Sequence, residues 1–294
     1  DNCGNASTTS ATFTIIDDTD PTITTQASNL EVQCDGAGNT AQLNAWLASN
    51  GGAVASDVCS NVTWTNNFAS VSDTCGATGS ATVTFTATDA CGNSSTTSAT
   101  FTIIDDTDPT ITTQASNLEV QCDGAGNTAQ LNAWLASNGG AVASDVCSNV
   151  TWTNNFASVS DTCGATGSAT VTFTATDACG NSSTTSATFT IIDNTDPTIT
   201  TQAANLEVQC DGSGNTAQLN AWLASNGGAV ASDVCSNVTW SNNFASVSDT
   251  CGATGSATVT FTATDNCGNS STTSATFTII DDTDPTITNQ AANL

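Results

Sequence analysis

The sequence predicts an all-β chain of tandem β-sandwich repeats, with one short helix inserted in each repeat. Three observations predict this fold class: the sequence repeats every 88 residues, apolar residues alternate along several short segments, and four cysteines recur in each period. A period of 88 residues is too long for a solenoid unit and has the length of one small domain. The chain is therefore expected to be a series of small domains of one kind.

The repeat is visible in the segment Asp1-Asn2-Cys3-Gly4-Asn5, which recurs with small changes from residues 89, 177 and 265. The predicted domains are residues 20–107, 108–195 and 196–283. Residues 1–19 are expected to be the C-terminal end of a preceding repeat, and residues 284–294 the start of a next one. Because the sequence begins and ends inside a repeat, it is expected to be part of a longer array.

Short segments with the alternation of β-strands are separated by polar turns within one repeat. In the first repeat they are residues 22–25, 30–34, 53–55, 62–65, a piece near Val71, 81–87 and 99–104. About seven short strands joined by polar turns predict an antiparallel sandwich.

A helix is predicted after Asn39. This residue is expected to cap the helix, with Gln42 three positions on, and Gly51-Gly52 is expected to end it. Its apolar face would carry Leu43, Trp46 and Leu47. Trp46 and Trp64 are expected to pack in or beside the core, rather than to form a platform on which sugars stack.

The composition excludes several classes of function. The chain has 27 Asp and Glu residues, no Lys, Arg or His, and a formal net charge of −27. It lacks an imidazole for acid–base catalysis, a lysine for a Schiff base and a basic patch for nucleic acid. We therefore expect neither an enzyme nor a nucleic-acid-binding protein. Every apolar run is far shorter than a membrane-spanning helix requires, so no membrane span is expected in this segment.

The cysteines predict disulfides and an oxidising, extracellular setting, because each repeat holds an even number of them. Zinc is the rival interpretation, but the cysteines are widely spaced and no Cys-x-x-Cys pair occurs. If strand directions alternate, Cys34 and Cys91 reach one end of the sandwich, and Cys59 and Cys75 the other. Among the three possible pairings we therefore favour Cys34–Cys91, Cys59–Cys75, Cys122–Cys179, Cys147–Cys163, Cys210–Cys267 and Cys235–Cys251.

Acidic residues gather where one predicted domain leads into the next. Like charges ~4 Å apart repel by about 1 kcal/mol even in water, and the chain has no cation of its own. Calcium takes six to eight oxygen ligands from carboxylates, amides and carbonyls, and we expect Ca²⁺ at these junctions. The alternative is that these segments are polar turns kept soluble by their charge. The candidate ligands are Asp17, Asp18, Asp20, Asp35, Asp89, Asn93, Asp105, Asp106, Asp108, Asp123, Asp177, Asn181, Asp193, Asn194, Asp196, Asp211, Asp265 and Asn269.

Two motifs in each repeat resemble the hyalin-repeat family, above all the arrays in secreted surface proteins of Bacteroidetes such as flavobacteria. They are Thr-Ala-Thr-Asp-Ala-Cys-Gly-Asn at residues 86–93 and Ile-Ile-Asp-Asp-Thr-Asp-Pro-Thr-Ile at residues 103–111. The resemblance implies an immunoglobulin-like sandwich and a link with adhesion at the cell surface. Two family cysteines are missing, one after the first strand at residues 24–26 and one in the last strand at residues 97–99.

The predicted function is structural. We expect an extracellular array at the cell surface, forming a filament or the stalk of an adhesin, stapled by disulfides and stiffened by calcium. Its expected partners are neighbouring copies of the same repeat or chain. The alternative is an adhesion module that binds glycans or proteins through its loops.

Overall fold

The structure is a computed structural model and describes residues 1–291, so the last three residues of the predicted segment 284–294 lie outside it. Three repeats with the same elements follow one another along the chain. The first contains β1 (Thr22–Thr25), β2 (Leu30–Gln33), α1 (Thr40–Ala48), the 3-10 turn η1 (Asn50–Gly52), β3 (Val54–Ser56), β4 (Thr63–Asn66), β5 (Gly79–Thr88) and β6 (Ser94–Ile104).

The other two repeats contain the same elements, one and two periods further along the chain. The second has β7 (Thr110–Thr113), β8 (Leu118–Gln121), α2 (Thr128–Ala136), η2 (Asn138–Gly140), β9 (Val142–Ser144), β10 (Thr151–Asn154), β11 (Gly167–Thr176) and β12 (Ser182–Ile192). The third has β13 (Thr198–Thr201), β14 (Leu206–Gln209), α3 (Thr216–Ala224), η3 (Asn226–Gly228), β15 (Val230–Ser232), β16 (Thr239–Asn242), β17 (Gly255–Thr264) and β18 (Ser270–Ile280). The predicted fold class, tandem all-β repeats with one short helix each, is confirmed.

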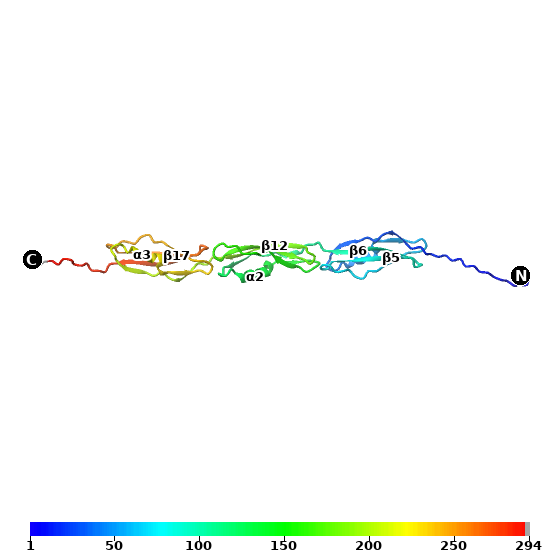
Figure 1. The fold of residues 1–294 in the computed structure, drawn as a ribbon, viewed down its shortest axis with the longest axis horizontal. Coiled ribbons are helices and arrows are strands. Elements are labelled where there is room, and N and C mark those ends of the chain that lie inside the picture. The colour runs from blue at the N-terminus through cyan, green and yellow to red at the C-terminus, as the bar shows by residue number, and fades with distance from the viewer. Residues whose placement is uncertain (292–294) are drawn as a thin grey trace. The chain divides into compact units, whose positions relative to one another are not determined.

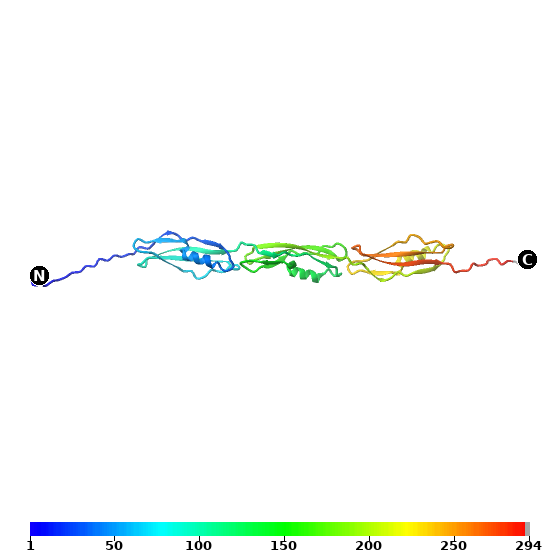
Figure 2. The same ribbon diagram turned by 180° about the vertical axis from the view of Figure 1, so that it is seen from behind.

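Each repeat is a small sandwich of a four-stranded and a two-stranded sheet. In the first repeat the four strands lie in the order β2-β6-β5-β4, and β1 pairs with β3. Figures 1 and 2 show this repeat in blue and cyan, with β5 and β6 labelled in Figure 1. The hairpin β5–β6 is paired along its whole length, from Gly79 opposite Ile103 to Thr88 opposite Ser94. No strand forms near Val71, so the repeat has six strands rather than the expected seven.

One strand pair differs in direction from the prediction. β2 runs parallel to β6, with Leu30 opposite Phe101 and Gln33 opposite Ile104, whereas an antiparallel sandwich was predicted. Alternating apolar residues are typical of both kinds of pairing, so the sequence does not distinguish them. The direction of β2 decides which end of the repeat carries Cys34.

The core lies between the sheet and the helix. Phe85 and Phe101 on the hairpin are fully buried, and Trp46 from α1 is 6% exposed. The Trp46 ring meets Phe85 edge-on at a centroid distance of 5.3 Å, a favourable geometry for aromatic pairs. Trp64 is half-buried against the same cluster, so both tryptophans pack as predicted.

The predicted capping box at the start of the helix does not form. Asn39 is fully buried with φ 49°, and its side chain makes no bond to the helix N-terminus. Its amide group instead accepts a hydrogen bond from the Asp35 N–H and donates one to the Gln33 carbonyl. Asn tolerates this left-handed conformation, so the residue fixes the loop between β2 and α1 rather than the helix end.

The described chain divides into two compact units that do not coincide with the repeats. The first comprises Asp1–Thr113 with Val142–Thr153 and Thr174–Thr184, and the second comprises Gln114–Ala141, Asn154–Phe173 and Thr185 onward. The predicted domain boundaries at residues 107, 195 and 283 remain a prediction. No helix among residues 1–291 has the length and apolar character needed to cross a membrane.

Candidate functional site

The two ends of a repeat carry different pairs of cysteines. β2 ends beside the end of β6, where the Cys34 N–H donates to the Ile104 carbonyl at 2.8 Å, and Cys75 precedes β5 at this same end. We call this the trailing end of a repeat. Cys91 lies in the turn between β5 and β6 at the opposite end, near Cys59, and we call this the leading end.

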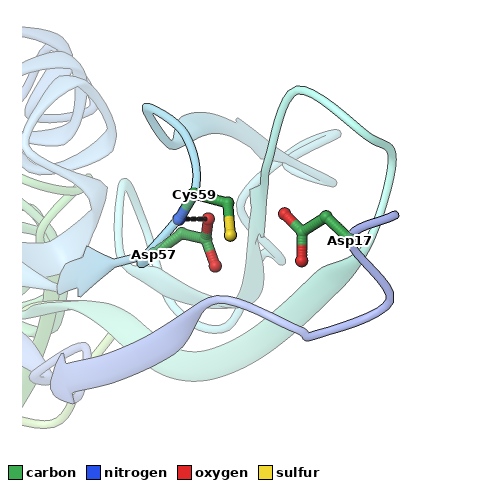
Figure 3. A group of neighbouring side chains, drawn as sticks. All are labelled: Asp17, Asp57 and Cys59. Atoms are coloured by element: carbon green, nitrogen blue, oxygen red, sulfur yellow. Dashed lines mark hydrogen bonds between the residues drawn. The ribbon is translucent and has the colours of Figure 1, made fainter. Parts of the chain in front are cut away.

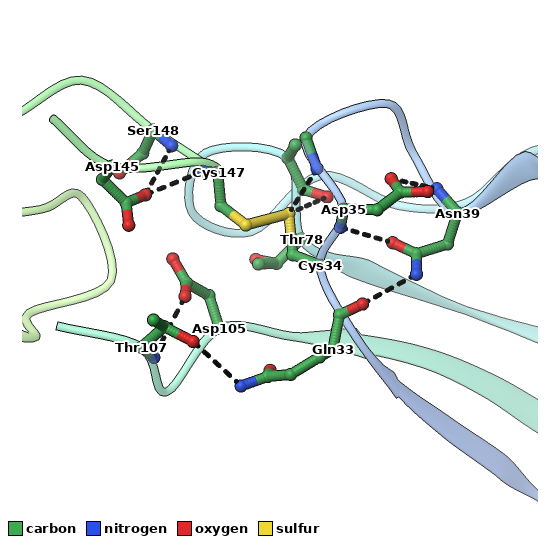
Figure 4. The surroundings of a disulfide bond; sticks show 12 residues. Gln33, Cys34, Asp35, Asn39, Thr78, Asp105, Thr107, Asp145, Cys147 and Ser148 are labelled. Atoms are coloured by element: carbon green, nitrogen blue, oxygen red, sulfur yellow. Dashed lines mark hydrogen bonds between the residues drawn. A yellow bond between two sulfur atoms is a disulfide. The ribbon is translucent and has the colours of Figure 1, made fainter. Parts of the chain in front are cut away.

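Disulfides join the trailing end of one repeat to the leading end of the next. Within the first compact unit, Cys34 is bonded to Cys147 with a Cα–Cα distance of 6.0 Å, and Cys75 is bonded to Cys179 at 5.2 Å. Figure 4 shows the first of these bonds with its surroundings. Within the second unit the same pairing rule gives Cys122–Cys235 and Cys163–Cys267.

The pairing predicted within each repeat is therefore wrong, although eight of the predicted cysteines are in disulfides. The overturned pairs are Cys34–Cys91, Cys59–Cys75, Cys122–Cys179, Cys147–Cys163, Cys210–Cys267 and Cys235–Cys251. Cys34 and Cys91 lie at opposite ends because β2 is parallel to β6. Cys59, Cys91, Cys210 and Cys251 are free, as is Cys3.

Two glycines make room for the bonded loops at the first junction. Gly76 has φ +59°, and a Cβ atom there would come within 2.6 Å of the Cys147 carbonyl oxygen. Gly36 has φ +74°, and a Cβ atom there would come within 2.5 Å of the Val146 carbonyl oxygen. The Ala77 N–H also donates to the Cys147 carbonyl at 2.9 Å. Glycine is needed here both for its positive φ and because the two backbones approach so closely.

Disulfide mapping tests this pairing, because small differences between the copies label the peptides. Cleavage before aspartate, without reduction, yields a Cys235 peptide that is marked by Ser241. The Cys122 peptide, residues 108–122, has the same sequence as residues 20–34 and differs from the Cys210 peptide by Ser116 in place of Ala204. We expect the Cys235 peptide and the Cys122 peptide to be linked in the mass spectrum. A link from the Cys235 peptide to the peptide that begins at Asp249 would contradict the inter-repeat pairing.

A pair of carboxylates lies at the leading end of each repeat, one from the linker and one from the loop after the third strand. In the first repeat Asp17 and Asp57 face each other beside Cys59 (Figure 3), and the three ligand atoms lie within 4.8 Å of one another. The same clusters are Asp105, Asp145 and Cys147, and Asp193, Asp233 and Cys235. The sulfur atoms of Cys147 and Cys235 are in disulfides, so the available ligands there are carboxylate oxygens.

The carboxylate of Asp105 is not satisfied by the protein. Its Oδ2 atom is buried and accepts no hydrogen bond. The same is true of the Oδ2 atoms of Asp17 and Asp193. Burial raises the pKa of the Asp105 carboxyl above its ordinary value, a bond from the Thr107 N–H works against this, and the Asp145 charge adds to it. Buried carboxylates normally have a partner, and none of the side chains in this sequence is a cation.

The second carboxylate of the pair is held in place by its own loop. Asp145 Oδ1 accepts hydrogen bonds from the N–H groups of Cys147 at 2.8 Å and Ser148 at 2.9 Å. These bonds point the other oxygen toward Asp105 (Figure 4). Two buried or half-buried carboxylates with a free oxygen each fit a hard divalent cation such as Ca²⁺, whose other ligands would be water and nearby carbonyls.

The predicted ligands at the Asp89 position have a structural role. Asp177 is 5% exposed, its Oδ1 accepts three backbone N–H groups, and its Oδ2 accepts the Asn181 side chain at 2.7 Å. Burial works to raise the pKa of this carboxyl, but these hydrogen bonds hold the pKa below its usual range. Asn181 also donates to the Asp105 carbonyl at 3.1 Å, so this turn fastens the linker to the leading end. Asp89 with Asn93, and Asp265 with Asn269, make the same contacts.

The remaining predicted ligands divide between the two ends. Asp35 was expected at the leading end, but it follows Cys34 at the trailing end and accepts the N–H groups of Ala37 and Asn39. Asp123 and Asp211 do the same in the other repeats. Asp20, Asp108 and Asp196 each accept one serine N–H, at 3.1–3.2 Å. Asp106 accepts Gln33, whereas Asp18 is exposed and Asn194 replaces an acid at the second junction.

Asp57, Asp145 and Asp233 are the members of the site that the sequence did not reveal. They lie in Asp-Val-Cys-Ser, away from the acid-rich linker, although their recurrence two positions before a cysteine was a usable signal. At the leading end of the first repeat, the charge of Asp17, followed by burial, raises the pKa of the free Cys59 thiol.

Comparisons with known proteins give similarity to solved structures only. No family model and no curated protein sequence matches the chain. The repeats 22–24 of mouse cadherin-23 are 11% identical with a TM-score of 0.30, and the match covers 90% of this chain and all of that one. The repeats 1–4 of PcdhgB3 are 13% identical with a TM-score of 0.28, over 90% of this chain and 77% of that one. The human desmocollin-1 ectodomain is 9% identical with a TM-score of 0.27, over 90% and 62%.

Proposed function

We propose that the chain is a structural segment of an extracellular repeat array, which forms a filament or an adhesin stalk at the cell surface. The disulfides carry this proposal, because each of the four links a repeat to its successor. A disulfide within a domain stabilises that domain, whereas a disulfide between domains makes the junction permanent. Such bonds persist in oxidising, extracellular settings.

The resemblance to hyalin repeats of flavobacterial surface proteins supports the same function and a bacterial source. A glycan- or protein-binding module is the alternative. It would be favoured by an exposed aromatic platform, but Trp46 is buried and Trp64 packs on the core. The structural role therefore accounts better for the described residues.

We further propose that Ca²⁺ occupies the carboxylate pair at each leading end. The unpartnered Oδ2 of Asp105, held beside Asp145, supports this proposal. The metal would tie the linker to the loop after the third strand. It would also neutralise carboxylates that have no counterion in the chain, so the junction would become stiffer.

A calcium titration followed by thermal unfolding tests the metal. At saturating Ca²⁺ we expect the Tm to rise by about 5 °C or more over the chelated protein, since a ligand at 100 times its Kd adds about 2.7 kcal/mol. The triple variant Asp57→Asn, Asp145→Asn, Asp233→Asn should lose most of this rise. The matched control is Asp18→Asn with Asp106→Asn, which should keep it because Asn194 already stands at the equivalent position. Equal responses in both variants, or none in the parent chain, would remove calcium from the proposal.

A further inference from the structure

Each repeat carries two Asn-x-Thr/Ser sequons, the acceptor motif for N-linked sugars on surface loops of secreted proteins. In the second repeat they are Asn149-Val150-Thr151 and Asn181-Ser182-Ser183. Neither has a proline in the middle, so the motif alone allows both. The structure places the two asparagines in different surroundings. Their equivalents in the other repeats are Asn61 with Asn93, and Asn237 with Asn269.

The amide nitrogen of Asn181 is already in use. Its Nδ2 atom donates to Asp177 Oδ2 at 2.7 Å and to the Asp105 carbonyl at 3.1 Å, so both of its hydrogens are engaged. A sugar on this nitrogen would replace one hydrogen and break a contact that fastens the linker to the leading end. The same contacts engage Asn93 and Asn269.

The amide nitrogen of Asn149 is not in use. Asn149 is exposed in the loop between β9 and β10. Asp145 holds this loop through two backbone N–H groups, and Thr151 donates to the Thr176 carbonyl at 3.1 Å. No hydrogen bond joins the Asn149 side chain to any of residues 1–291, so the fold does not depend on it. Asn61 and Asn237 are equally exposed in the corresponding loops.

Space is also available beside Asn149. Within the first compact unit it lines an open hollow of about 570 Å³, together with Gly76, Ala77 and residues 145–148. Within the second unit a hollow of about 480 Å³ lies beside Asn237 in the same way. Both volumes are in the range of small-ligand sites, so the first sugar of a glycan has room without moving the loop.

We propose that Asn149 and its equivalents Asn61 and Asn237 are acceptors of N-linked sugars. The amide nitrogen attacks the anomeric carbon of a sugar diphosphate donor, and the new C–N bond replaces the bond to the phosphate oxygen. The nucleoside- or lipid-linked diphosphate leaves with the bonding electrons, and a base of the transferase takes the proton that the amide loses. The inference goes beyond the structural role of the array and needs neither calcium nor a filament.

A sugar on Asn149 would lie over the junction. Cys147 lines the same hollow and is bonded to Cys34, and Asp145 belongs to the carboxylate pair. The glycan would therefore shield this disulfide from reductants. The same arrangement recurs at Asn237, beside the Cys122–Cys235 bond.

Glycopeptide mapping of the chain isolated from its own cells tests the proposal. Cleavage before aspartate puts each sequon in a separate peptide. We expect an added sugar mass on residues 57–72, 145–160 and 233–248, and none on residues 89–104, 177–192 and 265–280. A single hexose would indicate transfer from a nucleotide sugar, and a preassembled oligosaccharide transfer from a lipid-linked donor.

A transfer assay on the folded, oxidised chain isolates the effect of the structure. The enzyme is a soluble N-glycosyltransferase with UDP-glucose as the donor, and the acceptor carries Ser95→Thr, Ser183→Thr and Ser271→Thr, so that both sequons end in threonine. Occupancy at Asn149 should exceed that at Asn181 at least about tenfold, because both amide hydrogens of Asn181 are engaged. Synthetic peptides of residues 145–160 and 177–192 with the same change should be modified to similar extents.

The matched control is the variant Asn61→Gln, Asn149→Gln, Asn237→Gln, which should take up almost no sugar and keep the parent Tm. An unmodified native chain would overturn the inference, as would equal occupancy of Asn149 and Asn181 in the folded chain. A preference of the same size in the peptides would do so too, because it would belong to the motif and not to the fold. A modified chain without the Cys122–Cys235 link would remove the proposed function and leave this inference in place.

Discussion

Pulled from its two ends, the oxidised chain is expected to reach only about a quarter of the length of the reduced chain. The shortest covalent path runs through residues 1–34, crosses to Cys147, continues to Cys163, and crosses to Cys267. About 80 residues lie on this path, which corresponds to roughly 270 Å when extended, against roughly 1,000 Å for all 294 residues. Single-molecule force spectroscopy with and without a reductant measures both lengths.

Contour length also separates the possible disulfide pairings. Bonds within each repeat, between the Cys34 and Cys91 positions, would leave about 120 residues on the path, or roughly 400 Å. The variant Cys34→Ser, Cys147→Ser should lengthen the path of the present structure to about the same value, because the path then crosses through Cys75 and Cys179. A parent chain that already extends as far as this variant would therefore contradict the inter-repeat bonds.

Replacement of Asp177 by alanine is expected to destabilise the second repeat by at least about 2 kcal/mol, with or without calcium. The substitution removes the carboxylate that accepts the N–H groups of Cys179, Gly180 and Asn181 in this part-buried turn, and each hydrogen bond to a charged group contributes about 1.5–3 kcal/mol. Denaturant unfolding in calcium and in chelator measures the loss. The matched control is Asp161→Ala at an exposed site, which should change little. A loss for Asp177→Ala that appears only in calcium would make Asp177 a metal ligand instead.

Asp177 also determines the direction in which the stability of the chain changes with pH. Because the hydrogen bonds hold the pKa of Asp177 below its ordinary value, its stabilisation is fully present above about pH 4 and is lost as the pH falls through the folded-state pKa. The parent chain should therefore lose more stability than Asp177→Ala between about pH 4 and pH 2. Parallel acid-unfolding curves would contradict this assignment.

The parts of the fold that depend on neighbouring residues could be predicted from the sequence. The β5–β6 hairpin follows from strict alternation on both sides of a turn with Asp89 and Gly92, and the helix follows from the spacing of Leu43 and Trp46. The direction of β2 relative to β6 depends on residues about 70 positions apart, and its short alternating segment fits either direction. That one direction decides the end at which Cys34 and Asp35 lie.

The disulfide partners could not have been derived from the spacing, because the repeats are nearly identical. A bond from Cys34 to Cys59 and a bond from Cys34 to Cys147 involve the same local sequences. Only three-dimensional closeness decides between them. Half of the candidate metal site could be predicted, because the linker residues Asp17, Asp105 and Asp193 lie in acid-rich segments. Their candidate partners in the loop after the third strand are isolated acids in the sequence.

The staggered disulfides also make the chain tolerant of cleavage. Each bond spans 104 or 113 residues, which is longer than one repeat, so successive bonds overlap along the sequence. Every peptide bond between Cys34 and Cys267 is bridged by at least one disulfide, and most are bridged by two or three. A protease that nicks one loop there leaves both fragments covalently attached. The oxidised chain would therefore separate into pieces only after several cuts between Cys34 and Cys267.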